Sequence, residues 1–319
     1  MYPLLLKPVL KDYIWGGTKL QKIYDNSDFS RIAEAWTLAV HEDGSSLIAN
    51  GEYAGQTLDA PIKKLGAANI LGVSRKSGEA FPILIKLIDA AANLSIQVHP
   101  DDDYARRSGK PYGKTEMWYV VDCDAGAYIL CGFKEKLTAD EFAGLIKNDG
   151  LPGAMNKITV SPGDVVFIEA GMVHAICGGI FIAEIQQNSN TTYRIYDYGR
   201  TDAAGNPREL HVEEAKVVSN LSPAGNLDTR GETEILPNCK KTLLNKCDYF
   251  SVYELKISGV AKLDTEGVSF HHLSVIEGSA KIANKDGKVS AGVGGSVFIS
   301  ADSGEYAVEG NATVLLAFC

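Results

Sequence analysis

The chain has 319 residues, with 31 basic and 40 acidic side chains and a formal net charge of −9. Hydrophobic residues make up 45% and charged residues 22%, so the chain can bury a core and global disorder is excluded. The acidic balance argues against binding along a nucleic-acid backbone, but a few local Lys and Arg could still hold a small anion. The length predicts one large or two ordinary domains.

The sequence carries no signal for secretion or for a membrane. Lys7 and Lys11 interrupt the apolar N-terminal stretch and no small-residue cleavage site follows, so we expect no signal peptide. No uncharged apolar run reaches the roughly 18 residues needed to cross a bilayer. The six cysteines are scattered without a CxxC pair, which argues against a disulfide scaffold or a thiolate zinc site. We expect a cytoplasmic protein with reduced thiols.

Three helices are predicted in chain order. Apolar residues at helix-like spacing predict a helix over 58–71 that is broken at Gly66. Thr138 offers an N-cap oxygen and Glu141 stands three residues later, a capping-box pattern that predicts a helix after Thr138. A third helix is expected to begin near His211.

Most of the remaining sequence is predicted to form short β-strands bounded by Gly, Pro or Asp. The clearest runs are 83–88, 117–121, 165–168 and 180–183. Many short strands at close spacing favour a sandwich or barrel over a doubly wound sheet. We therefore expect a mainly β protein.

A weak internal repeat indicates two related β units. Residues 161–170 are echoed by residues 294–301, and each copy follows another strand with a glycine turn. The turn-rich stretch 222–238 is the predicted linker. The expected domains are therefore 1–225, which carries the chemistry, and 226–319.

One predicted strand holds the first candidate metal ligands. Within residues 94–100, strand alternation places Gln97 and His99 on one face and Ile96 and Val98 on the other. The two polar side chains are then about 7 Å apart along the strand, from a rise of ~3.3 Å per residue, and could bind one metal ion. The alternative is an ordinary amphipathic strand with its polar face in water.

Two more side chains extend this set. Glu116 opens a hydrophobic strand and could project inward, or it could be an edge charge that blunts strand pairing. His174 follows a Pro-Gly-Asp turn, an apolar strand and an Ala-Gly turn, a spacing that resembles the second cupin motif. With Gln97 and His99 these residues offer two nitrogens and two oxygens, which fits a divalent ion with an open coordination position. We expect one Zn²⁺ per chain, although this ligand set alone does not distinguish zinc from manganese, iron or cobalt.

Several short segments, in the same order and over about two-thirds of the chain, match one known family. The most specific of them is the string S-I-Q-V-H-P. The segments are Trp15–Gly17, Glu34–Trp36, Leu94–Pro100, Gly113–Met117, Gly171–Ala175 and Glu184–Gln186 followed by Tyr193 and Arg194. On these segments the chain resembles the type I mannose-6-phosphate isomerases (phosphomannose isomerases) of the short bacterial kind.

The resemblance implies a cupin-type jelly-roll catalytic barrel with some helices, and a smaller C-terminal cupin-like β domain without metal. It implies that the zinc ligands are Gln97, His99, Glu116 and His174. It also implies that Arg194 is the active-site arginine and that Lys114 takes part in substrate handling or proton transfer. The implied reaction is an aldose–ketose isomerisation that interconverts mannose 6-phosphate and fructose 6-phosphate through an enediolate.

The chain departs from the longer members of the family at three places. Thr115 replaces a proline that is common in the lysine motif, and Asn190 stands where an aspartate often precedes the arginine. Only 57 residues separate Glu116 from His174, too few for the helical insert of the longer forms.

The C-terminal unit is not expected to bind a second metal ion. Alignment of the two repeat copies places Glu305 at the position of His174. His271 and His272 are adjacent, so in a strand their rings point to opposite faces.

Two other classes of function stay open. The first is a different metal-dependent cupin, such as a sugar epimerase or an iron oxygenase, although Gln97 weighs against the two-His, one-carboxylate site of oxygenases. The second is a non-catalytic sugar-binding cupin, which would not need Lys114 and Arg194 near the metal. Arg200 and Arg208 are expected on a surface loop that could bind phosphate if it lies near the site. The expected partner is a small phosphorylated sugar, with no nucleic acid and no membrane, and the expected state is a monomer or weak homodimer.

Overall fold

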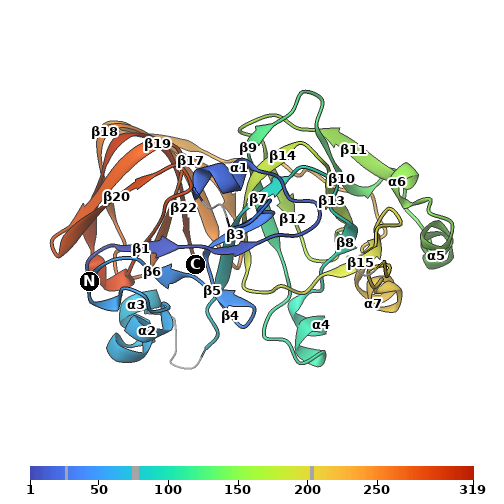
Figure 1. The fold of residues 1–319 in the computed structure, drawn as a ribbon, viewed down its shortest axis with the longest axis horizontal. Helices are drawn as coiled ribbons and strands as arrows, with labels where there is room; N and C mark the ends of the chain where they lie inside the picture. The colour runs from blue at the N-terminus through green and yellow to red at the C-terminus, as the bar shows by residue number, and fades with distance from the viewer. Residues whose placement is uncertain (26–27, 74–78, 202–204) are drawn as a thin grey trace.

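Antiparallel β-sheets make up most of the computed structural model, which describes residues 1–25, 28–73, 79–201 and 205–319. Figure 1 shows two β bodies side by side, one formed mainly by the last third of the chain and the other by its middle. Short helices lie around the outside of both bodies (Figure 1). The prediction of a mainly β protein is confirmed.

Two facing sheets form the body from the middle of the chain. The six-stranded sheet has the order β12 (Val165–Ile168), β9 (Glu116–Cys123), β14 (Ile180–Gln187), β7 (Ile83–Ala90), β3 (Glu34–Leu38) and β2 (Val9–Lys11). The five-stranded sheet has the order β11 (Met155–Thr159), β10 (Tyr128–Phe133), β13 (His174–Ile176), β8 (Ile96–Val98) and β15 (Tyr193–Tyr196). Apolar side chains of both sheets share one core that includes Ile88, Trp118 and Ile129. The space between the sheets is therefore shielded from water.

A nine-stranded sheet forms the C-terminal body. Its order is β16 (Thr233–Leu236), β17 (Cys239–Lys246), β18 (Ser251–Asp264), β22 (Glu305–Phe318), β19 (His271–Asn284), β21 (Ser296–Ile299), β1 (Leu4–Lys7) and β6 (Leu47–Ile48), with β20 (Gly287–Gly292) paired to β19. The long strands enclose a core that includes Leu255, Leu273 and Val308. Because β1 and β6 belong to this sheet, the N-terminal segment contributes to the C-terminal body. The domain division at residues 225 and 226 stays a prediction.

The helices and remaining short elements lie between these strands in the sequence. They are α1 (Lys19–Ile23), β4 (Val40–His41), β5 (Gly44–Ser45), the 3₁₀ turns Gly51–Tyr53 and Ala301–Ser303, α2 (Asp59–Leu65), α3 (Ala67–Leu71), α4 (Asp102–Arg107), α5 (Ala139–Lys147), α6 (Leu151–Ala154) and α7 (Val212–Val218). None of the helices in the described part of the chain is long and apolar enough to cross a membrane.

All three predicted helices are confirmed. The break at Gly66 separates α2 from α3. Gly66 has a φ of +92°, a backbone conformation that residues other than glycine rarely adopt. Helix α5 begins with the predicted capping box, in which Thr138 Oγ1 accepts a hydrogen bond from Glu141 N at 3.3 Å and Glu141 Oε2 accepts one from Thr138 N at 2.8 Å. Helix α7 follows directly after His211.

The predicted strands are confirmed, but the predicted linker is partly wrong. The runs over 83–88 and 180–183 extend further in the structure, as β7 and β14. Within the predicted linker 222–238, residues Thr233–Leu236 form β16, an edge strand that pairs with β17. Its side chains are largely exposed, so this strand lacks the apolar pattern that marks the others.

The two adjacent histidines of the C-terminal body serve its structure. His271 Nδ1 lies 2.8 Å from the hydroxyl of Tyr306, and His272 Nε2 lies 2.7 Å from the hydroxyl of Ser296. Ser296 in turn donates a hydrogen bond at 2.8 Å to the carbonyl oxygen of Thr37, which lies on β3 of the six-stranded sheet. These hydrogen bonds give both buried imidazoles a partner within the fold.

The capping box predicts a specific loss of stability. Thr138→Ala removes the oxygen that accepts from Glu141 N, so we expect it to lower the free energy of unfolding by about 1 kcal/mol. Thr138→Ser keeps that oxygen and should stay close to the parent. Urea denaturation of the three proteins measures the difference, and equal stability of the Ala and Ser variants would contradict it.

Candidate active site

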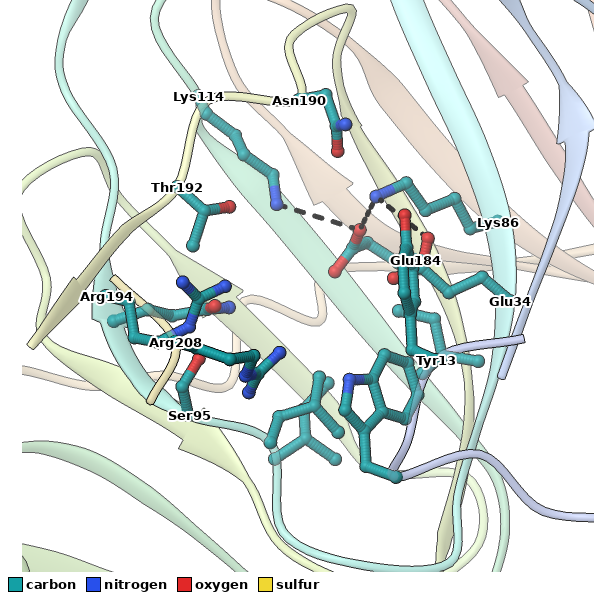
Figure 2. Close-up of a pocket in the computed structure, with 15 residues that line it drawn as sticks. Tyr13, Glu34, Lys86, Ser95, Lys114, Glu184, Asn190, Thr192, Arg194 and Arg208 are labelled. Carbon is teal, nitrogen blue, oxygen red and sulfur yellow. Dashed lines mark ion pairs between the residues drawn. The ribbon is translucent and has the colours of Figure 1, made fainter. Parts of the chain in front are cut away.

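A cavity of about 250 Å³ opens between the two facing sheets. Its polar lining comes from elements that are far apart in the sequence, because strands from both sheets and the loop after β15 meet there. Figure 2 shows that ion-paired side chains, Glu34, Lys86 and Glu184, gather at one end of the cavity, and that two arginines, Arg194 and Arg208, lie at the other. A polar ligand in this cavity would therefore have one preferred orientation.

Three buried side chains beside this cavity converge on one point. His99 follows β8, Glu116 begins β9 and His174 begins β13, and one ligand atom from each lies within 4.8 Å of the other two. His174 Nε2 is 3.3 Å from Glu116 Oε1, and His99 Nε2 is 3.6 Å from Glu116 Oε2. Glu116 therefore projects inward, and the interpretation of its carboxylate as an edge charge is wrong.

Gln97 lies next to this group. It stands opposite His174 in the β8–β13 pairing, and its amide is 3.4 Å from His174 Nε2. The structure thus brings together the four side chains that the sequence proposed as ligands, and the interpretation of Gln97 and His99 as a solvated strand face is wrong.

Backbone carbonyls fix the orientation of both imidazoles. His99 Nδ1 lies 3.0 Å from the carbonyl oxygen of Thr191, and His174 Nδ1 lies 2.8 Å from that of Met172. A carbonyl only accepts hydrogen bonds, so in each neutral ring Nδ1 carries the proton and the Nε2 lone pair faces Glu116. This second hydrogen bond is the usual support of a metal-binding histidine.

The protonation states of His99 and Glu116 suit the binding of a cation. Burial, followed by the charge of Lys114, lowers the pKa of His99 to about 3, so the ring is neutral at pH 7. Burial alone would raise the pKa of Glu116, but Lys114 and His99 outweigh it and hold that pKa well below its ordinary value. Two neutral imidazoles and one carboxylate thus face each other without water.

The group fits a divalent metal ion. His99 Nε2 and both oxygens of Glu116 are buried, and in the described residues none of these atoms has a well-oriented hydrogen-bond partner. Buried polar atoms without partners are costly, and bound cations are a common reason for them. Imidazole nitrogens with carboxylate and amide oxygens form a donor set that binds divalent first-row metals.

Lys114 connects the candidate metal centre to the cavity. Its Nζ is 2.7 Å from Glu116 Oε2 and 3.8 Å from Glu184 Oε1, and it lines the cavity beside both groups. The predicted position of Lys114 near the metal ligands therefore agrees with the structure.

The sequence analysis missed a second buried lysine. Lys86 Nζ lies 3.3 Å from Glu184 Oε1 and 3.6 Å from Glu34 Oε2 (Figure 2). Indole groups hold the two carboxylates, since Trp36 donates to Glu34 at 2.7 Å and Trp118 donates to Glu184 at 3.1 Å. The sequence does indicate this lysine, because Lys86 is the single charged residue in the apolar run 83–88. A lysine buried on a central strand needs an anionic partner.

Arg194 lies across the cavity from these carboxylates. It stands opposite Gln97 in the β8–β15 pairing, and its Nη1 donates to the carbonyl oxygen of Glu209 at 3.0 Å. The structure thus places the predicted arginine in the same cavity as Lys114. Asn190 also lines the cavity, and its Nδ2 donates to Asp43 Oδ2 at 2.8 Å.

Comparison with known proteins decides the family. A family model described as "Phosphomannose isomerase type I, catalytic domain" matches residues 4–129, and one described as "Mannose-6-phosphate isomerase, cupin domain" matches residues 240–319. The chain is similar to the probable mannose-6-phosphate isomerase GmuF of Bacillus subtilis, with 37% identity over 99% of both proteins. The chain belongs to the type I phosphomannose isomerase family. The family predicted from the sequence segments is thereby confirmed.

Other members of the type I phosphomannose isomerase family support this assignment. Mannose-6-phosphate isomerase ManA of Bacillus subtilis is 36% identical over 99% of this chain and 98% of its own. The crystal structure of the mannose 6-phosphate isomerase from Bacillus subtilis superposes with a TM-score of 0.92 at 33% identity, covering all of both chains. The expected catalytic domain with a C-terminal cupin domain is confirmed.

The candidate ligands predict a loss of metal from one conservative variant. Glu116→Gln keeps the shape but removes the charge, so we expect metal affinity to fall by about 10-fold or more. Inductively coupled plasma mass spectrometry of the purified variants gives the metal content. Glu254→Gln is a matched control, because Glu254 of β18 is also buried but accepts from the hydroxyl of Tyr119 and pairs with Lys256 Nζ at 3.5 Å, and is not among the proposed ligands. Undiminished metal affinity in Glu116→Gln would contradict the assignment.

The buried lysine predicts a large effect on stability. Lys86→Met would remove the cation that pairs with both Glu34 and Glu184 and leave Lys114 as the cation near Glu184, and breaking such a buried pair costs about 3–5 kcal/mol. Lys64→Met removes an exposed partner of Glu52 and should change the unfolding midpoint little. Thermal unfolding of both variants compares them, and an equal effect would show that Lys86 does not neutralise the two carboxylates.

Proposed function

We propose that this chain is a zinc-dependent aldose–ketose isomerase (EC 5.3.1.8) that interconverts mannose 6-phosphate and fructose 6-phosphate. The observation that carries the proposal is the buried group of His99, Glu116 and His174 with Lys114 beside it, at the wall of a cavity whose far end is cationic. Full-length relatives that are described as mannose-6-phosphate isomerases give independent support.

The proposed zinc ligands are Gln97, His99, Glu116 and His174. Zinc accepts this mixture of nitrogen and oxygen donors, and an open position would be left for substrate. When bound, the ion would act as a Lewis acid on an oxygen of the sugar. The chain itself supplies the orientation of the ligands, through the carbonyls of Met172 and Thr191.

Proton transfer is the step that we assign to Lys114. The amine would take the proton from C2 of the open-chain aldose, which leaves an enediolate; the proton on O2 would pass to O1, and the amine would return its proton at C1 to give the ketose. Glu184 Oε1 lies 3.8 Å from Lys114 Nζ and Lys86 stands beyond it, so the cavity holds further charged groups beside the proposed base.

Arg194 is proposed to stabilise the negative charge that develops on the enediolate. A guanidinium in a site with little water stabilises such charge strongly, because few solvent dipoles screen it. At the opposite end the carboxylates of Glu34 and Glu184 are paired with Lys86 and Lys114, so the excess positive charge lies with the arginines. A sugar phosphate would therefore bind with its phosphate toward the arginines and its reacting carbons toward Lys114. An iron oxygenase or a non-catalytic binder would need neither Lys114 nor this orientation.

The cellular setting forms a further part of the proposal. We propose a cytoplasmic enzyme that acts as a monomer or weak homodimer, with domains 1–225 and 226–319. None of the six cysteines, all within the described part of the chain, forms a disulfide bond, which supports a reducing compartment.

A coupled assay tests the activity. Mannose 6-phosphate is added to the purified protein, and fructose 6-phosphate formation is followed through a linked dehydrogenase. We expect turnover that a chelator abolishes and Zn²⁺ restores. Chelator-resistant activity would contradict the metal dependence, and inactivity of the zinc-loaded protein would contradict the isomerase assignment.

Lys114 gives a second test of the mechanism. Lys114→Ala with its metal content intact should lower kcat by about 10²–10⁴-fold, the usual contribution of a general base. Lys110→Ala, which removes an exposed lysine from the same segment, should leave kcat unchanged. An unchanged kcat in metal-loaded Lys114→Ala would rule out Lys114 as the base.

A further inference from the structure

A buried carboxylate organises the cationic end of the cavity. Asp197 follows β15 and is only 6% exposed. Its Oδ2 accepts from Arg208 Nε at 2.7 Å and its Oδ1 accepts from Arg208 Nη2 at 2.5 Å, so the two side chains form a two-point fork. Oδ1 also accepts from Arg200 Nη2 at 2.5 Å. This geometry fixes the plane of the Arg208 guanidinium, because two parallel hydrogen bonds allow only one relative orientation of the two groups.

The two arginines that Asp197 holds have different surroundings. Arg200 donates its Nη1 to the carbonyl oxygen of Asn93 at 2.5 Å and its Nε to that of Asp197 at 3.1 Å, so its nitrogens bind the loop. Arg208 lines the cavity beside Arg194, and Asp197 does not engage its Nη1 (Figure 2). Arg208 is thus the member of the pair that is placed to meet a ligand.

The charges at this end do not cancel. Among the described residues, Arg194, Arg200 and Arg208 carry three positive charges here, whereas Asp197 is a buried carboxylate that pairs with Arg200 and Arg208 and the side chain of Glu209 is exposed. Burial and then the charges of Arg208 and Arg200 lower the pKa of Arg194, which shows that the three guanidinium groups repel one another. Arg194 Nε is also buried and lacks a hydrogen-bond partner among the described residues. In the described part of the chain the guanidinium groups thus outnumber the carboxylate that they pair with, and such an excess of positive charge suits a phosphate monoester, which carries about −1.5 to −2 at pH 7.

We infer that Arg208 binds the phosphate group of the substrate and that Asp197 is the positioning residue that aims it. Asp197 acts in two ways, since it fixes the guanidinium plane and removes part of the repulsion between arginines before the substrate arrives. The inference rests on the proposed function, because it takes the ligand to be a sugar phosphate. It separates the roles of neighbouring arginines, with Arg208 on the phosphate and Arg194 on the reacting oxygens.

Steady-state kinetics and direct binding test the inference on the zinc-loaded enzyme. Arg208→Gln should raise KM for mannose 6-phosphate by about 10- to 100-fold, the worth of one charged hydrogen-bonding group, while kcat changes little. The inhibition constant of inorganic phosphate should rise in parallel. Arg208→Lys keeps the charge but loses the fork, so its KM should fall between those of the parent and Arg208→Gln.

Asp197→Asn tests the positioning role. It should raise KM by roughly tenfold at nearly constant kcat, and it should add little when Arg208→Gln is already present, because both changes remove one interaction. Asp228→Asn is the matched control, since Asp228 forms a similar fork with Arg230 that is more exposed and lies outside the cavity. Thermal unfolding checks that each variant is folded, and Arg208→Lys at the partly exposed arginine keeps the test usable if Asp197→Asn unfolds.

The outcomes separate this inference from the proposed function. Unchanged KM and phosphate inhibition in Arg208→Gln would overturn the assignment of Arg208. A fall in kcat without a rise in KM in Asp197→Asn would overturn the positioning role. The binding of inorganic phosphate can be measured by isothermal titration calorimetry without turnover. If phosphate binding depends on Arg208 while mannose 6-phosphate is not converted, the isomerase proposal fails and the phosphate site stands.

Discussion

The structure depends on a carboxylate that has no access to water. Glu116 is fully buried between two neutral imidazoles, and Lys114 is the cation that lies against it. A buried charge with incomplete compensation costs several kcal/mol, so the fold must gain that energy elsewhere. A divalent cation at the same point would bind His99 Nε2 and the Glu116 oxygens, which have no well-oriented hydrogen bond within the described part of the chain and of which Oε2 is paired with Lys114. A metal ion bound here would thus stabilise this interior as well as supply the chemistry that we propose.

Two facing sheets make this arrangement possible. Glu116 comes from the six-stranded sheet, and His174 and Gln97 come from paired strands of the five-stranded sheet, so each sheet holds its own ligands in register. The C-terminal body uses similar positions differently. His271 and His272 bind to hydroxyl groups of Tyr306 and Ser296, and the second of these links the two bodies through Thr37. Buried histidines on β-strands thus form the candidate metal site in one body, and in the other they form hydrogen bonds that hold the strands and the two bodies together.

The sequence predicted what local patterns determine. Strand alternation placed Gln97 and His99 on one face, and capping chemistry placed the start of α5 at Thr138. It could not predict pairs that depend on tertiary contacts, such as Lys86 with Glu34, or Asp197 with Arg208 across a loop. Strand β16 was missed for a related reason, because an exposed edge strand needs a partner strand rather than an apolar face. The roles of the site residues and the identity of the metal stay predictions.

Anomalous X-ray diffraction on crystals of the purified protein, collected above and below the zinc absorption edge, tests the central claim most directly. The account predicts one strong anomalous peak per chain, coordinated by the side chains of Gln97, His99, Glu116 and His174. The same four side chains with no anomalous peak between them, or a peak bound only by other residues, would contradict it.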